Sequence, residues 1–246
     1  MPGKSRLDQL LVARGLAQSR TEAQALVMAG LVFSAGRRLD KSGLMVAADV
    51  ALEVRGREHP WVSRGGVKLT AALNHFQIDP AGRVALDIGA STGGFTDVLL
   101  SRGAAKVYAV DVGHGQLAWR LRQDPRVVVR ERVNARALSA EEVPEPVSLI
   151  VCDVSFIGLT LVLPAALRLV APQADLLALI KPQFEAGRDQ VGKGGIVRDA
   201  AVRTAVCQRI SDWLAAQPGW RVASLIPSPI SGADGNVEYL IAAARD

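Results

Sequence analysis

The sequence predicts an α/β protein in which a doubly wound, mostly parallel sheet follows a small α+β domain. Continuous runs of valine, isoleucine and leucine recur about every 20 to 27 residues with helical segments between them, which is typical of parallel strands buried on both faces. Residues 1–58 instead contain two short helical patterns and a glycine turn. With 246 residues, 49% of them hydrophobic, the chain can form one full-sized core and a small attached domain.

Two short helices and a hairpin are predicted at the N-terminus. The first helix is indicated by three leucines at helical spacing, Leu7, Leu10 and Leu11, and it ends at Gly15. Ser19 and Glu22 form a capping box that begins a second helix, which ends at Gly30. Short strands are then expected around a tight turn at 34–36, at residues 31–33, 37–39 and 50–54.

Three stretches of this domain carry a resemblance to a known family: residues 6–11, the helix start at 19–23 and the exit at 30–32. They resemble the S4-type RNA-binding module, in which a helix pair and the loop after it present basic side chains to structured RNA. The resemblance implies that six cations lie near phosphate: Arg6, Arg14, Arg20, Arg37, Arg38 and Lys41.

The distribution of charge favours the same interpretation. Residues 1–68 hold 11 Lys and Arg against 6 Asp and Glu, whereas residues 69–246 hold 18 of each sign. The entire net charge of +5 therefore lies in the N-terminal part. Clustered cations attract a polyanion more strongly than dispersed ones, so this part is expected to bind nucleic acid. An ordinary solvated basic face is the alternative.

The composition also indicates the compartment. The two cysteines, Cys152 and Cys207, are far apart in apolar stretches, which is typical of a reducing compartment and provides no metal site. Charged residues interrupt the N-terminus before any apolar signal segment forms, and the longest uncharged runs are 14 residues. We expect a cytoplasmic protein with no membrane span, no bound metal and a monomeric or weakly dimeric state.

A connection of mixed charge, proline and glycine separates the two parts. We assign residues 1–58 to the N-terminal domain, 59–66 to the linker and 67–246 to the larger domain. Strands of the larger domain are predicted at 84–86, 107–110, 127–129, 149–151 and 176–180, with two further strands at 221–226 and 237–243.

A nucleotide cofactor is predicted at the carboxyl ends of the first two strands. The first strand leads into residues 87–97, where glycines allow a ligand to approach the backbone and the following helix offers free N–H groups. The second strand ends in Asp111, 24 residues beyond Asp87, where a carboxylate can accept both hydroxyls of a ribose. Nicotinamide dinucleotide and S-adenosylmethionine both fit this pattern.

The Asp87-x-Gly89 start and Asp111 resemble the class I, Rossmann-like S-adenosylmethionine-dependent methyltransferases, whose sheet ends with a reversed hairpin strand. The resemblance implies that the glycine loop binds the methionine part, Asp111 the ribose and Asn134 the adenine. The implied cofactor set is Asp87, Gly89, Ala90, Ser91, Gly93, Gly94, Phe95, Asp111, Val112, Asn134 and Asp153.

Four charged residues lie at strand ends or at the entrance to the larger domain. Lys68 precedes the first helix expected there, Asp153 and Lys181 follow two strands, and Glu238 begins the last strand. The set resembles the lysine, aspartate, lysine, glutamate centre of the FtsJ-type ribose 2′-O-methyltransferases. Such a reaction needs a base, and a second cation with partial desolvation favours the neutral form of a lysine amine.

Taken as a whole, the chain resembles the TlyA/haemolysin A family of ribosomal RNA methyltransferases. The matching stretches are residues 61–69, 87–97, 153–157, 181–185, 194–199 and 235–240. The resemblance implies 2′-O-methylation of cytidines in ribosomal RNA, and it adds Arg64, Arg188 and Lys193 to the RNA-binding set. The linker departs from the family's Arg-x-Trp-Val, with His59 and Pro60 before Trp61.

Two other functions compete with this one. A ribosome assembly factor with a vestigial methyltransferase domain would bind RNA without catalysis, although the four charged residues are all present. A membrane-lytic protein is suggested by the haemolysin name, but the sequence contains no long apolar span and no strongly basic amphipathic helix.

Overall fold

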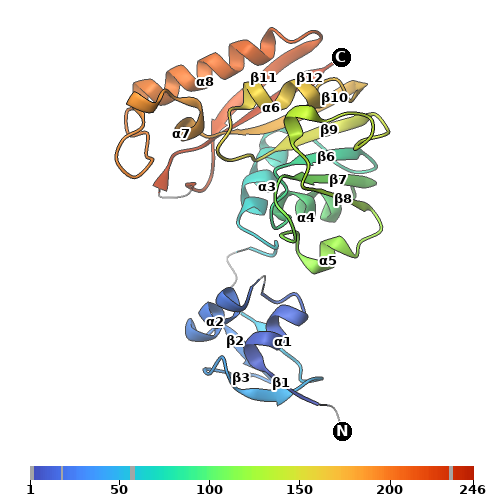
Figure 1. Cartoon of the computed structure of the whole chain (residues 1–246), viewed down its shortest axis with the longest axis vertical. Coiled ribbons are helices and arrows are strands. Elements are labelled where there is room, and N and C mark those ends of the chain that lie inside the picture. The colour runs from blue at the N-terminus through green and yellow to red at the C-terminus, as the bar shows by residue number, and fades with distance from the viewer. Residues whose placement is uncertain (1–2, 18, 56–58, 233–234) are drawn as a thin grey trace.

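The computed structural model describes residues 3–17, 19–55, 59–232 and 235–246. Two groups of elements follow one another along the chain (Figure 1). We call residues 3–55 the N-terminal unit and residues 59–246 the body. The predicted boundary at residue 58 lies outside the described residues.

The N-terminal unit is built around the two predicted helices. Its elements are β1 (Lys4–Arg6), α1 (Leu7–Ala13), α2 (Arg20–Met28), β2 (Val32–Ser34), β3 (Arg37–Arg38), β4 (Met45–Ala47) and β5 (Glu53–Val54). The side chain of Ser19 accepts a hydrogen bond from the backbone of Glu22, as a capping residue should. A small core joins the helices to β2 through Leu7, Leu11 and Val27. Strands β1 and β4 pair with each other and were not predicted.

The body contains one seven-stranded sheet, and every strand predicted for it is present. Its strands are β6 (Val84–Ile88), β7 (Lys106–Asp111), β8 (Val127–Glu131), β9 (Val147–Cys152), β10 (Val170–Ile180), β11 (Trp220–Pro227) and β12 (Tyr239–Arg245). Their order is β11-β12-β10-β9-β6-β7-β8. Strand β12 is antiparallel to both of its neighbours, whereas β8, β7, β6, β9 and β10 are parallel. This is the reversed strand that the resemblance implied.

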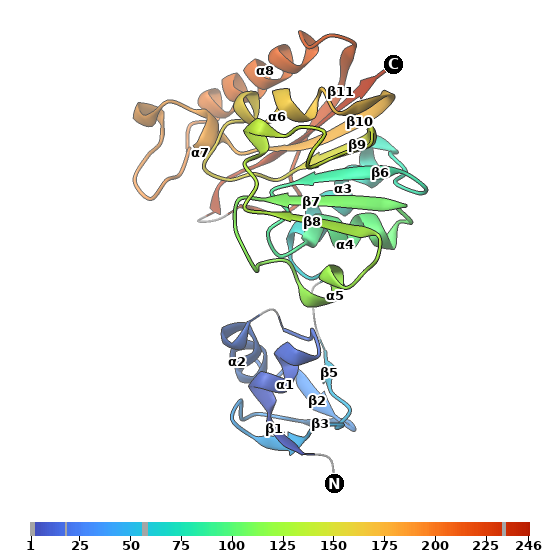
Figure 2. The same cartoon turned by 45° about the vertical axis from the view of Figure 1, so that its right-hand side comes forward.

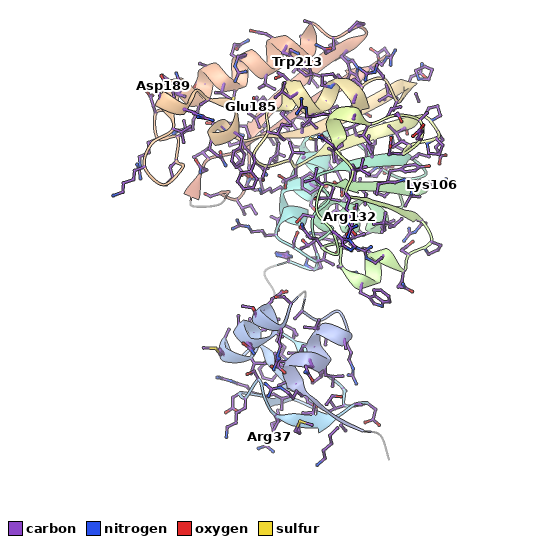
Figure 3. All side chains as sticks on the ribbon, viewed as in Figure 1. Arg37, Lys106, Arg132, Glu185, Asp189 and Trp213 are labelled. Carbon is purple, nitrogen blue, oxygen red and sulfur yellow. The ribbon has the colours of Figure 1, made fainter. Side chains whose placement is uncertain are left out.

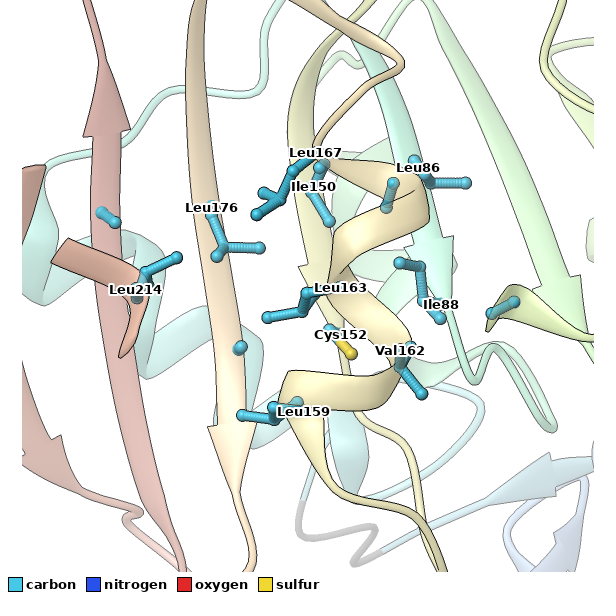
Figure 4. Packing of buried hydrophobic residues seen from close by; sticks show 14 of the residues in the cluster. Leu86, Ile88, Ile150, Cys152, Leu159, Val162, Leu163, Leu167, Leu176 and Leu214 are labelled. Atoms are coloured by element: carbon cyan, nitrogen blue, oxygen red, sulfur yellow. The ribbon is translucent and has the colours of Figure 1, made fainter. Parts of the chain in front are cut away.

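Helices cover both faces of the sheet (Figure 2). They are α3 (Gly65–Phe76), α4 (Gly94–Ser101), α5 (Trp119–Arg122), α6 (Leu159–Ala166), α7 (Pro182–Glu185) and α8 (Ala200–Ala215). Helices α6 and α8 pack on one face against Ile150 and Leu176, as Figure 4 shows for α6. Helices α3 and α4 pack on the other face against Leu149 and Leu177. Successive strand residues thus enter opposite cores, which confirms the doubly wound fold.

The start of the body differs from the prediction. Helix α3 begins at Gly65, inside the predicted linker, so Lys68 lies within its first turn rather than before it. Two glycines suggested a loop, yet a Cβ at Gly66 would come within 2.3 Å of the Trp61 side chain, so glycine allows that ring to pack on the helix. Val62 is buried in the same core. No helix in the described part of the chain is long and apolar enough to cross a membrane.

Candidate functional site

Two adjoining cavities lie at the carboxyl ends of the parallel strands, where doubly wound sheets bind ligands. The first has a volume of about 510 Å³ and is lined by both Lys68 and Lys181; we call it the lysine cavity. The second, about 410 Å³, is lined by Asp111 and is called the Asp111 cavity. Their walls share residues from two strand-end loops: Gly89, Ser91, Asp153, Ser155 and Phe156. A ligand in one cavity can therefore contact a ligand in the other.

The four predicted catalytic residues meet in the lysine cavity as two ion pairs. The Nζ atom of Lys68 lies 2.5 Å from Oε2 of Glu238, and Nζ of Lys181 lies 2.6 Å from Oδ1 of Asp153. Lys68 comes from α3, Asp153 follows β9, Lys181 follows β10, and Glu238 precedes β12. All four side chains are less than one-fifth exposed. Charges so buried require partners, and each has one here.

Glu238 is more enclosed than a residue at the rim of a cavity. Its side chain is 2% exposed, and a Cβ at Gly232 would come within 2.0 Å of its Oε1 atom. The loop before β12 therefore folds tightly over this carboxylate. Asn236 reinforces that loop, because its side chain accepts a hydrogen bond from Val197 N at 3.2 Å and donates one to Gly195 O at 3.0 Å.

Three uncharged residues for which the sequence predicts no role also line the lysine cavity: Ser155, Phe156 and Phe184. Ser155 Oγ accepts a hydrogen bond from Lys181 Nζ at 2.9 Å. Phe156 is 89% exposed, adopts a positive φ of 67°, and its ring centroid lies 4.9 Å from that of Phe184. Strained backbone and an exposed aromatic side chain are both typical of functional loops. Ser155 and Phe156 follow Asp153 closely and Phe184 follows Lys181 closely, but nothing else in the sequence marks them.

The Asp111 cavity contains the expected ribose-binding carboxylate. Asp111 accepts hydrogen bonds from Ser91 N at 2.8 Å and from Gly113 N at 2.7 Å. A carboxylate has about four acceptor positions, so hydroxyl donors can still bind it. Val112 and Asn134 line the same cavity. Asn134 also caps the short 3-10 helix Ala135–Ala137, since its Oδ1 atom accepts a hydrogen bond from Arg136 N at 3.1 Å.

The glycine loop after β6 separates into residues that face a cavity and residues that do not. Gly89, Ala90, Ser91, Gly94 and Phe95 line the lysine cavity. Gly89 has a φ of +81°, and a Cβ there would lie 2.8 Å from the carbonyl oxygen of Asp153. Glycine at this position therefore lets the loops after β6 and β9 come close enough to share both cavities.

Two residues predicted to bind the cofactor lie behind this loop and line neither cavity of the described structure. A Cβ at Gly93 would meet the side chain of Leu121 at 2.3 Å, so this glycine serves packing. Asp87 is fully buried, and Thr96 Oγ1 donates a hydrogen bond to it at 2.6 Å. Burial raises the pKa of Asp87 to about 7. The motif gave the residue types at both positions, but it did not show that Asp87 is directed toward the core or that Gly93 makes room for Leu121.

The predicted RNA-binding cations of the N-terminal unit form two groups. Arg6 and Arg20 each lie 2.9 Å from the buried carboxylate of Asp8. The Arg6 guanidinium, helped by Arg20, holds the pKa of Asp8 well below its usual range. Arg14 donates hydrogen bonds to the carbonyl groups of Ala48 and Val50. These three arginines therefore stabilise the unit itself.

The second group is exposed. Arg37 and Arg38 form β3, and Lys41 follows them on the same unit. Figure 3 places Arg37 at the end of the unit that is remote from the body. In the body, Arg64 lines the lysine cavity. Arg188 and Lys193 are exposed on the projecting loop after α7, whose Gly195 reaches that cavity.

Comparison with known proteins matches both parts of the chain. The family model for FtsJ-like methyltransferases matches residues 61–245, and the model for S4 domains matches residues 5–50. A 16S/23S rRNA (cytidine-2′-O)-methyltransferase TlyA from Mycobacterium tuberculosis is 50% identical over 98% of this chain and 90% of its own. Hemolysin A from Brachyspira hyodysenteriae is 42% identical over 96% and 98% of the two chains.

A solved structure supports the same assignment. A hemolysin-type protein from Streptococcus thermophilus superposes with a TM-score of 0.75 at 42% identity, covering 100% of this chain and 90% of that one. The similarity thus spans the S4 domain, the sheet and both cavities. The chain belongs to the TlyA/haemolysin A family, in which an S4 domain precedes an FtsJ-like methyltransferase domain.

Proposed function

We propose that the protein transfers the methyl group of S-adenosylmethionine to the 2′-hydroxyl of cytidine in ribosomal RNA. The observation that carries the proposal is the pair of buried ion pairs, Lys68 with Glu238 and Lys181 with Asp153, in a cavity that adjoins Asp111. The substrate class follows the TlyA relative, which is 50% identical and is named for cytidine 2′-O-methylation of ribosomal RNA. An assembly factor without activity would not need two buried lysine pairs.

The residues of the Asp111 cavity fit S-adenosylmethionine. Asp111 offers a carboxylate to the ribose hydroxyls, and Asn134 and Val112 lie where an adenine could contact them. The loop from Gly89 to Phe95 leads to the lysine cavity and would hold the methionine part. When bound, this cofactor supplies a methyl group on a positively charged sulfur, which makes the methyl carbon electrophilic.

Lys181 acts as the base in this proposal. A ribose hydroxyl is a poor nucleophile while it keeps its proton, so a group in the lysine cavity must accept that proton. Lys181 Nζ lies in this cavity and is held by Asp153. Lys68 lines the same cavity. Glu238 partners Lys68 and keeps it in place.

The N-terminal unit supplies RNA affinity in this proposal. Residues 1–58 bind structured RNA through the exposed cations Arg37, Arg38 and Lys41, residues 59–66 connect the parts, and residues 67–246 perform the chemistry. Because ribosomal subunits are the substrate, the protein works in the cytoplasm.

Calorimetry with the full chain tests the cofactor assignment. S-adenosylmethionine should bind, and Asp111→Ala should weaken binding about 10- to 100-fold, the value of lost hydrogen bonds to a charged group. Asp212→Ala removes an exposed carboxylate from α8 and should leave binding unchanged. Binding of a nicotinamide dinucleotide without binding of S-adenosylmethionine would disprove the assignment.

A further inference from the structure

Ser155 contacts the nitrogen on which the proposed reaction depends. It lies two residues after Asp153 on the loop that follows β9, and both residues reach the same atom of Lys181. The Nζ atom is 2.6 Å from Asp153 Oδ1 and 2.9 Å from Ser155 Oγ. One loop thus gives this amine two oxygen neighbours.

The two oxygen neighbours of Lys181 Nζ restrict the direction in which a neutral amine can point its lone pair. An ammonium group has three N–H donors, whereas a neutral amine has two N–H donors and one lone pair. To accept a proton, the neutral amine must direct its lone pair at the substrate hydroxyl. Ser155 Oγ accepts one N–H of the amine, and Asp153 Oδ1 lies in ion-pair contact on another side of the nitrogen, so the lone pair of the neutral amine is left the position that faces neither oxygen. Without Ser155, the hydrogen bond that holds the amine is lost, and the amine could rotate so that its lone pair points away from the substrate hydroxyl.

The surrounding structure fixes Ser155 relative to Lys181. Glu185 ends the short helix α7 that begins directly after Lys181, and its side chain is 4% exposed. Its Oε1 atom accepts a hydrogen bond from Leu159 N at 2.7 Å, at the start of α6. This bond links the segment that carries Lys181 to the end of the loop that carries Ser155 (Glu185 is labelled in Figure 3).

We infer that Ser155 is a positioning residue that, together with Asp153, directs the lone pair of Lys181 toward the ribose 2′-hydroxyl. The inference rests on the proposed function of Lys181 as base. As the 2′-oxygen forms its bond to the methyl carbon, its proton moves to Nζ, and the electrons of the broken sulfur–carbon bond stay on sulfur. Lys181 is then an ammonium whose three N–H groups face Asp153, Ser155 and the methylated oxygen.

Single-turnover methylation with saturating RNA and cofactor tests the inference in the full chain. Ser155→Ala should lower the rate about tenfold, equivalent to about 1.4 kcal/mol in the barrier. The loss should be the same at every pH up to the plateau of the rate, because orientation and not protonation is impaired. Binding of S-adenosylmethionine by calorimetry and of RNA by filter retention should not change. Ser101→Ala, which removes a hydroxyl from the end of α4, is the matched control and should behave as wild type.

A double variant separates orientation from any independent effect of the serine. In a Lys181→Met background there is no amine to orient, so adding Ser155→Ala should cause no further loss. An unchanged plateau rate in Ser155→Ala, a second tenfold loss in the double variant, or weakened ligand binding would each overturn the inference. Absence of methyl transfer to ribosomal RNA by the wild-type protein would instead overturn the proposed function.

Discussion

Lys181 is the residue whose replacement should have the largest effect on the reaction. Lys181→Ala should slow single-turnover methylation on the order of 10²-fold or more, the usual contribution of a positioned acid–base group, while both ligands still bind. Lys181→Arg should not restore the rate, because a guanidinium keeps its proton at any working pH. The wild-type rate should rise with pH to a plateau.

Lys106 offers a matched control for this measurement. Its Nζ atom lies 2.5 Å from Glu145 Oε1. Lys106 is the first residue of β7, at the amino-terminal ends of the strands and away from the cavities (labelled in Figure 3). Lys106→Ala removes a lysine ion pair without touching either cavity, so turnover should stay at the wild-type value. If Lys181→Ala also kept the wild-type rate, positioning of the hydroxyl alone would be the source of catalysis.

Asp87 should make the stability of the body depend on pH. In the unfolded chain its carboxyl group ionises near 3.8, whereas burial keeps it protonated in the folded state up to about pH 7. Between these values the folded state holds a proton that the unfolded state has lost, so the contribution of this group to stability falls as pH rises. Asp87→Asn should therefore flatten the decline in the free energy of unfolding from pH 4 to pH 7.

Urea denaturation at a series of pH values measures this effect. The Asn side chain can still accept the hydrogen bond from Thr96, so the variant should be more stable than wild type at pH 8. Asp212→Asn on the exposed face of α8 is the control and should follow the wild-type curve. A steeper decline in Asp87→Asn would show that the buried carboxylate is ionised and stabilising.

Individual residues differ in how far the sequence reveals them. Charged residues such as Asp153 and Lys181 could be predicted, because together with Lys68 and Glu238 they match the four-residue centre of the FtsJ-type methyltransferases, although each alone could have been an ordinary ion-pair partner. Ser155 could not, since a serine in a loop is common and only its distance to Lys181 distinguishes it. The motif predicts that Asp87 and Gly93 bind the cofactor, but it does not show that the Asp87 side chain is buried or that Gly93 is needed for the packing of Leu121.

At the scale of elements, β3 is the part of the N-terminal unit that should determine RNA affinity. Its two residues, Arg37 and Arg38, are exposed, whereas Arg6 and Arg20 are paired with Asp8. Replacing both β3 arginines by glutamate should weaken RNA binding and lower the slope of affinity against salt concentration by about one unit for each lost phosphate contact. Cofactor binding should be unaffected.

Filter binding across a range of salt concentrations checks this expectation. Arg168 and Arg221 are exposed near the amino-terminal ends of the strands, away from the cavities. Replacing both by glutamate is the matched control and should change the salt slope little. An unchanged slope in the β3 variant would remove this strand from the RNA interface.

Elements were predictable where one physical signal dominated. The central strands β6 and β9 are apolar runs because both of their faces are covered. The edge strand β11 is partly exposed, and its apolar residues were still sufficient to predict it. Strands β1 and β4 have three residues each, none of them buried, so no apolar pattern marks them. The start of α3 was placed too late because Gly65 and Gly66 usually signal a loop, and only the packing of Trp61 explains them.

For the whole molecule, the N-terminal unit and the body meet beside helix α5. A cleft of about 250 Å³ there is lined by Val12 and Gly15 from the unit and by Trp119 from α5. On the body side, Asp97 of α4 accepts a hydrogen bond from Val62 N at 2.8 Å and pairs with Arg120 of α5. Val62, which precedes α3, is therefore anchored to the helices beside the glycine loop.

The most direct test of the account is to identify the nucleoside that receives the methyl group. Ribosomal subunits that lack the modification are incubated with the full chain and S-adenosylmethionine carrying an isotopically labelled methyl group, and the RNA is digested to nucleosides for mass spectrometry. The account predicts label in 2′-O-methylcytidine with the wild-type protein and a loss of that label on the order of 10²-fold with Lys181→Ala at equal time. Label on a nucleobase, or no label in ribosomal RNA at all, would contradict it.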